Sequence, residues 1–156
     1  MNWTHLHLAL NHVPVLGSLF VALLLITGLV KRSEELKRMS LWWFVALTLL
    51  AIPIKFTGDF AFEANANEPW MEESRATVHE QSADQATTAV FLLGVMSGVG
   101  LFLGRKGRER PPWVYTATLV VALVTFGLMA RSANLGGQIR HEEIRGASYP
   151  VDILVQ

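Results

Sequence analysis

The sequence predicts an all-α protein, a four-helix transmembrane bundle with both termini on the periplasmic or outer side. Two observations support this prediction. Four stretches without a charged residue alternate with short polar segments, and half of all residues are hydrophobic. Two of the polar segments are strongly basic, and the one between them is acidic. A chain of 156 residues is expected to form one domain, here residues 1–156.

The uncharged stretches have the lengths of membrane spans. They are Val13–Val30, Met39–Ile54, Ala86–Gly104 and Pro111–Ala130. A spanning helix needs about 20 apolar residues, and flanking residues extend the predicted spans to about 6–30, 39–58, 84–104 and 111–131. The second stretch is short, but the long stem of Lys55 lets its charge reach water. Four such helices leave too little polar chain for a soluble protein.

Proline and glycine mark the expected helix ends. Gly58 is read as a C-cap of the second helix, and Pro69 as the first residue of the third. The third helix would then run from about Pro69 to Gly104. The fourth is expected to end near Asn134, before the Gly136-Gly137 pair.

Small residues predict close packing of the third helix. The pattern Gly94-x-x-x-Gly98 permits two helices in lipid to approach closely. We therefore expect Gly98 to lie at a helix–helix contact.

The charge pattern predicts the orientation. The segments 31–38 and 105–110 carry four basic residues each. From Asp59 to Asp84 there are seven acids and only Arg75 as a base. The positive-inside rule puts the basic segments in the cytoplasm. We therefore expect a multi-pass protein of the bacterial inner membrane, with both termini outside.

Composition excludes several functions. The chain has no cysteine, which rules out c-type haem attachment, iron–sulfur ligation by this chain and disulfides. Net charge is zero, so bulk charge implies no nucleic-acid partner. The N-terminus lacks a basic region before its apolar stretch, which indicates a retained first helix rather than a signal peptide.

All five histidines fall on the predicted outer side. They are His5, His7, His12, His79 and His141. Ionisable residues at membrane depth are costly, so a one-sided group of histidines indicates a site. His12 is the strongest candidate, because Asn11 precedes it as a hydrogen-bond partner for an imidazole. Interfacial histidines that bond only headgroups and water are the plainer interpretation.

His79 lies at the start of the third helix. Ala83, one turn on, leaves room beside its imidazole, and Glu80 is a candidate acceptor that would orient a histidine. Asp59 and Glu63 close the second helix and are candidates for the same orienting role or for binding metal. The plainer interpretations are a solvated helix start and an ordinary helix end.

The segment after the fourth helix brings His141 back towards the bundle. Gly136 and Gly137 allow the backbone to approach a flat ligand closely. Arg140, with Arg145, is a candidate to neutralise the propionates of a haem. A helix cap followed by a solvated tail is the competing interpretation.

Several of these segments together resemble a family of uncharacterised bacterial four-helix membrane proteins. Its members begin with approximately His-Pro-x-x-x-His-Phe-Pro, and here Leu8 and Val13 replace the first proline and the phenylalanine. The matching residues are, in chain order, His7, His12, Pro14, Thr57, Gly58, Asp59, Ala61, Glu63, His79, Glu80, Gly136, Gly137 and His141. The resemblance implies a shared site at these histidines and does not name its ligand.

A b-type cytochrome-like electron-transfer subunit is the favoured function. Four-helix bundles can hold haem between facing helices through axial histidines. His12 and His79 are predicted to ligate one haem b iron, with His141 in reserve and His7 as a ligand of a second site. The expected partners are the lipid bilayer, quinol, and membrane or periplasmic redox subunits. No catalytic residue is assigned, and a subunit is favoured over a stand-alone enzyme.

Two other functions stay open. A non-haem site for Zn, Cu, Fe or Mn would use imidazole and carboxylate ligands such as His12, Glu63, His79 and Glu80. Alternatively, the chain is a structural subunit of a larger membrane complex, a role that suits the short second span. The tail 138–156 ends in apolar residues, which fits the same role.

Overall fold

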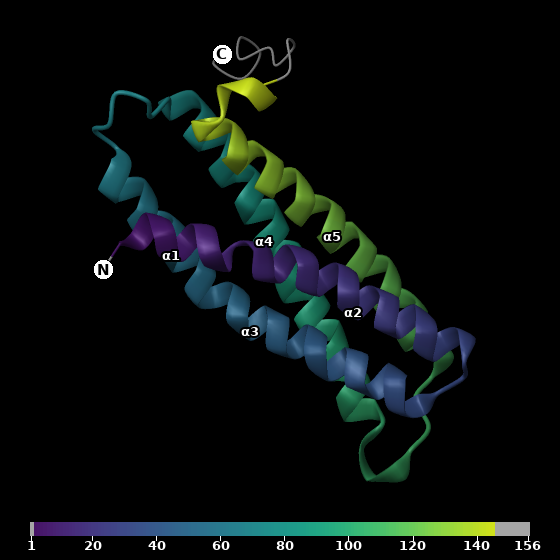
Figure 1. Cartoon of the computed structure of the whole chain (residues 1–156). Coiled ribbons are helices and arrows are strands. Elements are labelled where there is room, and N and C mark those ends of the chain that lie inside the picture. Colours follow the sequence, from purple (N-terminus) through teal and green to yellow (C-terminus); the bar gives the residue numbers. More distant parts are fainter. Residues whose placement is uncertain (1, 146–156) are drawn as a thin grey trace, which may run out of the picture.

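Helices are the only regular secondary structure in the part of the chain that the structure describes. A computed structural model of the protein describes residues 2–145. Its elements are shown in Figure 1, and in chain order they are α1 (Trp3–Leu10), α2 (His12–Val30), α3 (Glu34–Asn65), α4 (Glu73–Leu103), η1 (Arg105–Gly107), α5 (Pro112–Arg140) and η2 (Glu142–Ile144).

Within residues 2–145, four helical segments are long and apolar enough to cross a membrane. They are Trp3–Val30, Glu34–Asn65, Glu73–Leu103 and Pro112–Arg140. The first consists of α1 and α2, with a break at Asn11 (Figure 1). Pro14 explains the break, because it has no N–H for the Leu10 carbonyl. The prediction of an all-helical chain with four membrane-length helices is confirmed.

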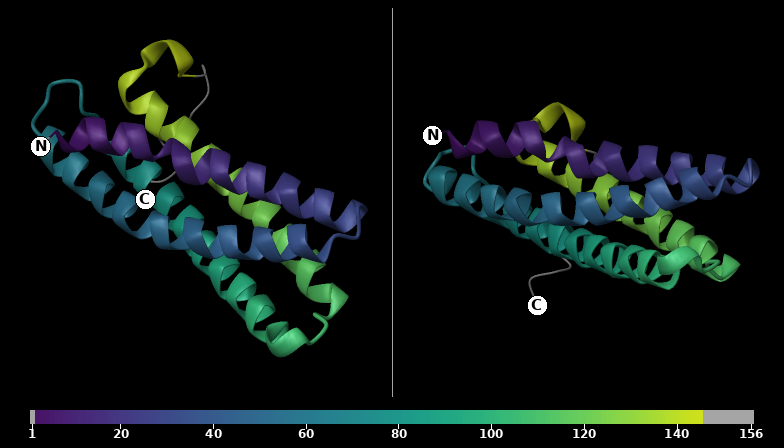
Figure 2. Two further views of the ribbon diagram at one scale, coloured as in Figure 1. Left: turned by 60° about the horizontal axis from the view of Figure 1, so that its bottom comes forward. Right: turned by 90° about the horizontal axis from the view of Figure 1, so that it is seen from below.

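The four long helices form a ring in which α2 and α4 are diagonal to each other. α2 packs against α3 and α5, and α4 packs against the same two helices (Figure 2). α1 continues the diagonal helix α2 and packs mainly on α3. One end of the bundle, here called the histidine end, contains the start of α1 and α4 and the ends of α3 and α5. The loops 31–33 and 104–111 form the opposite, basic-loop end.

α1 is held on α3 by side-chain contacts. The rings of Trp3 and Phe60 lie with their centroids 4.7 Å apart. The Asn65 side-chain amide donates to the Thr4 hydroxyl at 2.7 Å. These contacts fix the face that α1 turns towards the bundle, and with it the direction of its histidines.

The core lies along the bundle axis in two groups of buried residues. The group nearer the basic-loop end is larger, and its members are Val21, Ala22, Leu25, Leu41, Phe44, Leu47, Leu93, Tyr115 and Ala122. The group nearer the histidine end is smaller, and its members are Ala51, Ala86, Val90 and Met129. The only buried aromatic residues of the two groups, Phe44 and Tyr115, therefore lie in the half nearer the basic-loop end.

Two predicted helix ends are wrong, and both involve glycine. α3 continues through Gly58 to Asn65, and α5 continues through Gly136 and Gly137 to Arg140. In both helices, a glycine lies against a histidine ring of a neighbouring helix, as described below. These glycines therefore serve packing inside a helix rather than helix termination.

The start of α4 also differs from the prediction. The helix begins at Glu73, with Glu72 as its N-cap residue, and Pro69 lies in the preceding turn. Glu73 supplies a carboxylate to the first turn, where the helix dipole favours it.

The prediction for Gly98 is wrong within the single chain. A Cβ atom added at Gly98 would meet nothing within 4 Å. The close contact belongs to Gly94, whose added Cβ would lie 2.5 Å from the Thr48 hydroxyl oxygen. Gly94 and Gly98 are four residues apart on α4. The face of α4 that contacts α3 is therefore rotated slightly from the face that the sequence predicted.

A cluster of polar side chains closes the basic-loop end. The Tyr115 hydroxyl donates to the Glu34 carboxylate at 2.9 Å, and Lys37 pairs with the same carboxylate. The Arg110 guanidinium donates to the Gly100 carbonyl at 3.0 Å. These bonds join α3, α4 and α5 at one end of the bundle. The apolar tail end predicted within 146–156 lies outside the described residues.

Candidate cofactor site

Two of the five histidines, His7 and His79, lie inside the histidine end of the bundle. They belong to α1 and α4, which come from diagonally opposed spans. Both side chains are half-buried. The bundle therefore places two imidazoles at one of its ends, on segments far apart in the sequence.

The His79 ring has a defined tautomer. Its Nδ1 atom lies 3.0 Å from the Ser132 carbonyl oxygen of α5. A carbonyl only accepts, so Nδ1 carries the proton and donates. In the neutral ring, Nε2 then holds a lone pair, and it has no hydrogen-bond partner within residues 2–145.

The His7 ring has the same tautomer for a related reason. Its Nδ1 atom lies 3.2 Å from the Thr57 hydroxyl oxygen of α3. That hydroxyl donates its own proton to the Ile54 carbonyl at 2.6 Å. It can therefore only accept from His7, which puts the imidazole proton on Nδ1 and leaves Nε2 with a lone pair.

Each of the two rings lies directly on a glycine of the adjacent helix. A Cβ atom added at Gly58 would be 3.1 Å from Cε1 of His7, and one added at Gly136 would be 2.9 Å from Cε1 of His79. Any other residue would press on the imidazole. The pair α1–α3 and the pair α4–α5 therefore hold their histidines in the same way.

Polar atoms without partners lie one helical turn below the histidine pair, towards the bundle centre. Asn11 follows His7 by one turn, and Ser82 follows His79 by one turn. The Asn11 Oδ1 and Ser82 Oγ atoms are both buried, with no hydrogen-bond partner in the described part of the chain. Ser82 is only 1% exposed. The floor of the site is thus polar and unsatisfied.

The other three histidines are exposed. His12 turns its Nδ1 back to the Leu8 carbonyl of its own helix at 3.1 Å. His5 is exposed on α1, and His141 follows α5, with its Nδ1 2.8 Å from the Glu143 carboxylate. His7 and His12 are five residues apart, so they point to different faces of the span, about 140° apart on a helix. The predicted pairing of His12 with His79 stays a prediction, and of these two histidines His7 is the half-buried one.

The remaining residues predicted for the site lie around it. The Arg140 guanidinium lies over the Trp70 ring, 4.4 Å from its centroid. Gly137 faces Ile144, to which an added Cβ would come within 3.2 Å. Glu63 and Glu80 are exposed, and neither bonds a histidine in the structure. Asn11 lies at the site but does not orient a ring, since its Oδ1 is unpaired.

Charged groups flank the site on the outside of the bundle. Lys55 of α3 and Asp84 of α4 form an ion pair of 2.6 Å, so Lys55 pairs with a neighbouring helix. Arg131 of α5 donates to the Gln85 side chain of α4 at 3.1 Å. These contacts join α4, which carries His79, to α3 and α5, whose groups bond the two histidine rings.

The sequence does not predict the contacts of Thr57, Gly58 and Ser132 with the histidines. The resemblance includes Thr57 and Gly58 without giving them a role, and Ser132 belongs to no motif, because it acts through its carbonyl. Their signal is the spacing between a histidine and a small residue on an antiparallel partner helix. That signal emerges only when the helix register is known.

Two chemical properties follow from the arrangement. The site offers two imidazole Nε2 lone pairs, each on a ring held by a hydrogen bond from Nδ1. Metal-bound histidines are typically held by such a bond, which fixes the ring and raises its basicity. Within residues 2–145, no group of three or more His, Asp or Glu side chains lies together so as to hold a metal ion.

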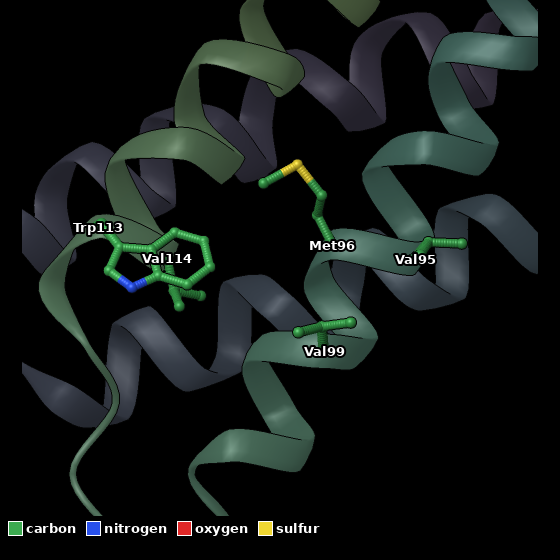
Figure 3. Close-up of a pocket in the computed structure, with 5 residues that line it drawn as sticks. All are labelled: Val95, Met96, Val99, Trp113 and Val114. Atoms are coloured by element: carbon green, nitrogen blue, oxygen red, sulfur yellow. The ribbon is translucent and has the colours of Figure 1, made fainter.

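A second surface feature lies between α4 and α5 near the basic-loop end. This groove has a volume of about 100 Å³. Its lining residues are Val95, Met96, Val99, Trp113 and Val114, whose side chains are drawn in Figure 3. Apart from the Trp113 indole N–H, its lining offers no polar group to orient a ligand. It matches lipid chains rather than a specific site.

Comparison of this chain with known protein families, curated proteins and solved structures gave no match.

Proposed function

We propose that the protein is a b-type cytochrome-like electron-transfer subunit of the bacterial inner membrane, with His7 and His79 as axial ligands of one haem b. One observation carries the proposal: two interior imidazoles on diagonal helices are both fixed as Nδ1–H tautomers with Nε2 open. The resemblance to four-helix membrane proteins with outer-face histidine motifs agrees with this assignment.

The residues present fit a haem better than a protein-only metal site. A haem iron needs only axial ligands from the protein, because the porphyrin supplies the others. Two histidines meet that need, whereas a non-haem site uses three or more protein ligands. Gly58 and Gly136 let the two rings lie directly against the neighbouring helices, where an added Cβ would come within 3.1 Å and 2.9 Å of the Cε1 atoms. When bound, the haem would supply one-electron chemistry.

The protein's own groups hold and tune the two imidazoles. Thr57 and the Ser132 carbonyl accept the Nδ1 protons, so each ring is kept from rotating. Each ring is also made a better electron donor at Nε2. The partly buried setting lowers the local dielectric and limits access of water. Arg140 stays available at the rim as a cation near the predicted outer face.

The orientation and partners belong to the same proposal. The basic loops face the cytoplasm, so both termini and the histidine end face the periplasm. Electrons would pass between quinol in the bilayer and a membrane or periplasmic redox subunit. The helix lengths support the membrane setting.

A visible absorption spectrum of the purified full chain, loaded with haem, tests the proposal. We expect a Soret band and a sharp α-band on reduction. His7→Ala and His79→Ala should each abolish the low-spin spectrum. The matched controls His5→Ala and His12→Ala should keep it, because both side chains are exposed.

Two results would overturn the ligand assignment. If His12→Ala loses the spectrum while His7→Ala keeps it, His12 is the ligand instead of His7. If the parent binds no haem, metal analysis of the same sample becomes decisive. Bound Zn, Cu, Fe or Mn would favour the non-haem alternative, and the absence of both would favour a structural subunit.

A further inference from the structure

A hollow, here called the α3 hollow, lies on the outer face of α3 at the basic-loop end of the bundle. Its volume is about 310 Å³, and it is lined by Glu35, Arg38, Met39 and Trp42. These residues follow one another at helical spacing, so they form one stripe over the first turns of the helix. The hollow therefore combines a carboxylate, a guanidinium, a thioether and an indole on one side of α3.

The charged residues next to this hollow are directed elsewhere. Lys37 pairs with Glu34, and its ammonium lies over the Tyr115 ring of α5, 4.6 Å from the ring centroid. Tyr115 also donates to Glu34, so both charges belong to the cluster that closes the basic-loop end. Glu35 and Arg38, in contrast, are exposed and line the hollow.

The lining changes in character along the helix axis. Glu35 is nearest the start of α3, Arg38 follows about 4.5 Å further on, and Trp42 lies about 6 Å beyond Arg38. The same face continues at intervals of seven residues with Leu49 and Phe56, which are 61% and 58% exposed. In a bilayer, the charged start of this face lies among the headgroups and its apolar continuation lies in the hydrocarbon.

This order of groups matches a phospholipid that carries an ammonium in its headgroup. A guanidinium binds phosphate oxygens through two parallel hydrogen bonds, and a carboxylate accepts from a primary ammonium, which has three N–H donors. In phosphatidylethanolamine, an ethylene link joins the ammonium to the phosphate, and the glycerol esters and acyl chains follow. Arg38 therefore suits the phosphate and Glu35 the ammonium. Trp42 suits the ester region, where an indole N–H finds acceptors.

Glu35 discriminates between classes of phospholipid. The anionic headgroup of phosphatidylglycerol would meet the Arg38 cation, but also a carboxylate of its own sign in the same hollow, and such like-charge contacts are costly. The headgroup of phosphatidylcholine carries methyl groups in place of the ammonium N–H donors, so it offers the carboxylate no hydrogen bond from nitrogen. The lining therefore favours a primary amine beside the phosphate.

We propose that the α3 hollow binds one molecule of phosphatidylethanolamine, whose acyl chains lie along the apolar face of the same helix. Arg38 holds the phosphate and Glu35 holds the ammonium. This inference goes beyond the proposed electron transfer and needs no haem. It requires only that the helices span a bilayer.

Native mass spectrometry of the full chain in detergent, with one defined lipid added to each sample, measures the site directly. The lipids are phosphatidylethanolamine, phosphatidylglycerol and phosphatidylcholine at equal concentration. We expect one bound phosphatidylethanolamine, at several-fold higher occupancy than either of the other two. Phosphatidylethanolamine should also raise the temperature of thermal unfolding most, because a ligand that binds only the folded state stabilises it.

Single substitutions separate this site from ordinary surrounding lipid. Arg38→Gln should lower the occupancy of phosphatidylethanolamine several-fold, and Arg108→Gln is its control, since Arg108 is exposed at the same end but outside the hollow. Trp42→Leu should also lower it. The control is Trp43→Leu, because Trp43 is 53% exposed and does not line the hollow. Glu35→Gln should weaken phosphatidylethanolamine and strengthen phosphatidylglycerol, because it removes the carboxylate charge.

Three results would overturn the proposal. Equal losses in Arg38→Gln and Arg108→Gln would show that lipid is attracted only by the overall charge of the basic-loop end. Preference of the parent for phosphatidylglycerol would make the hollow a site for anionic lipid. Equal binding of phosphatidylcholine would remove the role of the primary amine. None of these results bears on the haem proposal, whose test is the visible spectrum.

Discussion

At the scale of the single residue, Gly94 and Gly98 of α4 differ in what surrounds them: one is closely packed and the other is not. Gly94 lies against Thr48 of α3, whose hydroxyl bridges two carbonyls. Gly98 faces open space. The same residue type therefore sets a close helix contact at one position and none at the other.

Gly94→Ala and Gly98→Ala should change stability in opposite directions. An added Cβ at Gly94 would come 2.5 Å from the Thr48 hydroxyl oxygen, and overpacking of this kind costs about 1–3 kcal/mol. At Gly98, alanine meets nothing and should stabilise the helix by about 0.5–1 kcal/mol. Thermal unfolding in detergent measures both. Equal destabilisation by the two variants would contradict the register of α4.

The inward-facing histidines show what residue patterns could and could not predict. The one-sided group of five histidines was visible in the sequence. His7 and His12 are five residues apart, so helical periodicity alone points them about 140° apart. His7 meets Thr57 of α3, while His12 bonds its own helix. Which of the two faces turns inward depends on how α1 packs on α3, and no local motif reports that packing.

At the scale of the element, hydropathy located the helices but not their ends. α3, α4 and α5 all extend beyond the apolar stretches into polar residues at the histidine end. Their extra turns carry Asn65, Arg75 and Gln138, which are polar but bonded to neighbours. A hydropathy pattern marks only the residues that are apolar enough to lie in the bilayer. These extra turns are polar and are stabilised by contacts with neighbouring residues instead.

A small ionic cluster connects the start of α4 to the segment after α5. The Glu72 carboxylate lies 2.5 Å from Arg75 and 3.9 Å from Arg145. Arg145 also donates to the Gln138 and Ile139 carbonyls at the end of α5. The hydrogen bond from Arg75 holds the pKa of Glu72 below its ordinary value.

The depressed pKa predicts a pH-dependent contribution to stability. The charged carboxylate stabilises the fold above the ordinary pKa of glutamate, and this contribution is lost as pH falls through the lower folded-state pKa. Glu72→Gln should therefore be less stable than the parent at neutral pH, and the two should converge in acid. The difference should stay below about 1 kcal/mol, because 42% of the Glu72 side chain is exposed.

Unfolding curves of the parent and variant across this pH range measure the effect. Glu68→Gln is the control, since Glu68 is exposed in the preceding loop. A Glu72→Gln difference that persists unchanged in acid would show that the carboxylate charge does not act in this cluster.

At the scale of the whole molecule, the number and length of the apolar stretches were enough to predict the fold class. Four long apolar helices must bury their faces against one another or in lipid, and antiparallel neighbours joined by short loops satisfy both. What could not be foreseen is the diagonal relation of α1–α2 to α4, because it depends on which pairs pack. That relation places His7 and His79 on diagonal segments at one end of the bundle, so the site is a property of the assembled bundle.

The two basic loops meet at one end of the bundle, which makes the orientation testable with a single experiment. Loops 31–33 and 104–111 are adjacent at the basic-loop end, while Asn67 lies at the histidine end and is exposed. The charge asymmetry between these ends predicts that the basic loops stay in the cytoplasm. The chain has no native cysteine, so a single introduced thiol reports its own side of the membrane.

In intact bacterial cells whose outer membrane has been made permeable, an impermeant thiol reagent should label Asn67→Cys and miss Glu109→Cys. After the inner membrane is opened, both should react, which shows that Glu109→Cys is folded and accessible. Labelling of Glu109→Cys alone in intact cells would invert the bundle. The histidine pair would then face the cytoplasm, and any electron partner would have to be sought on that side.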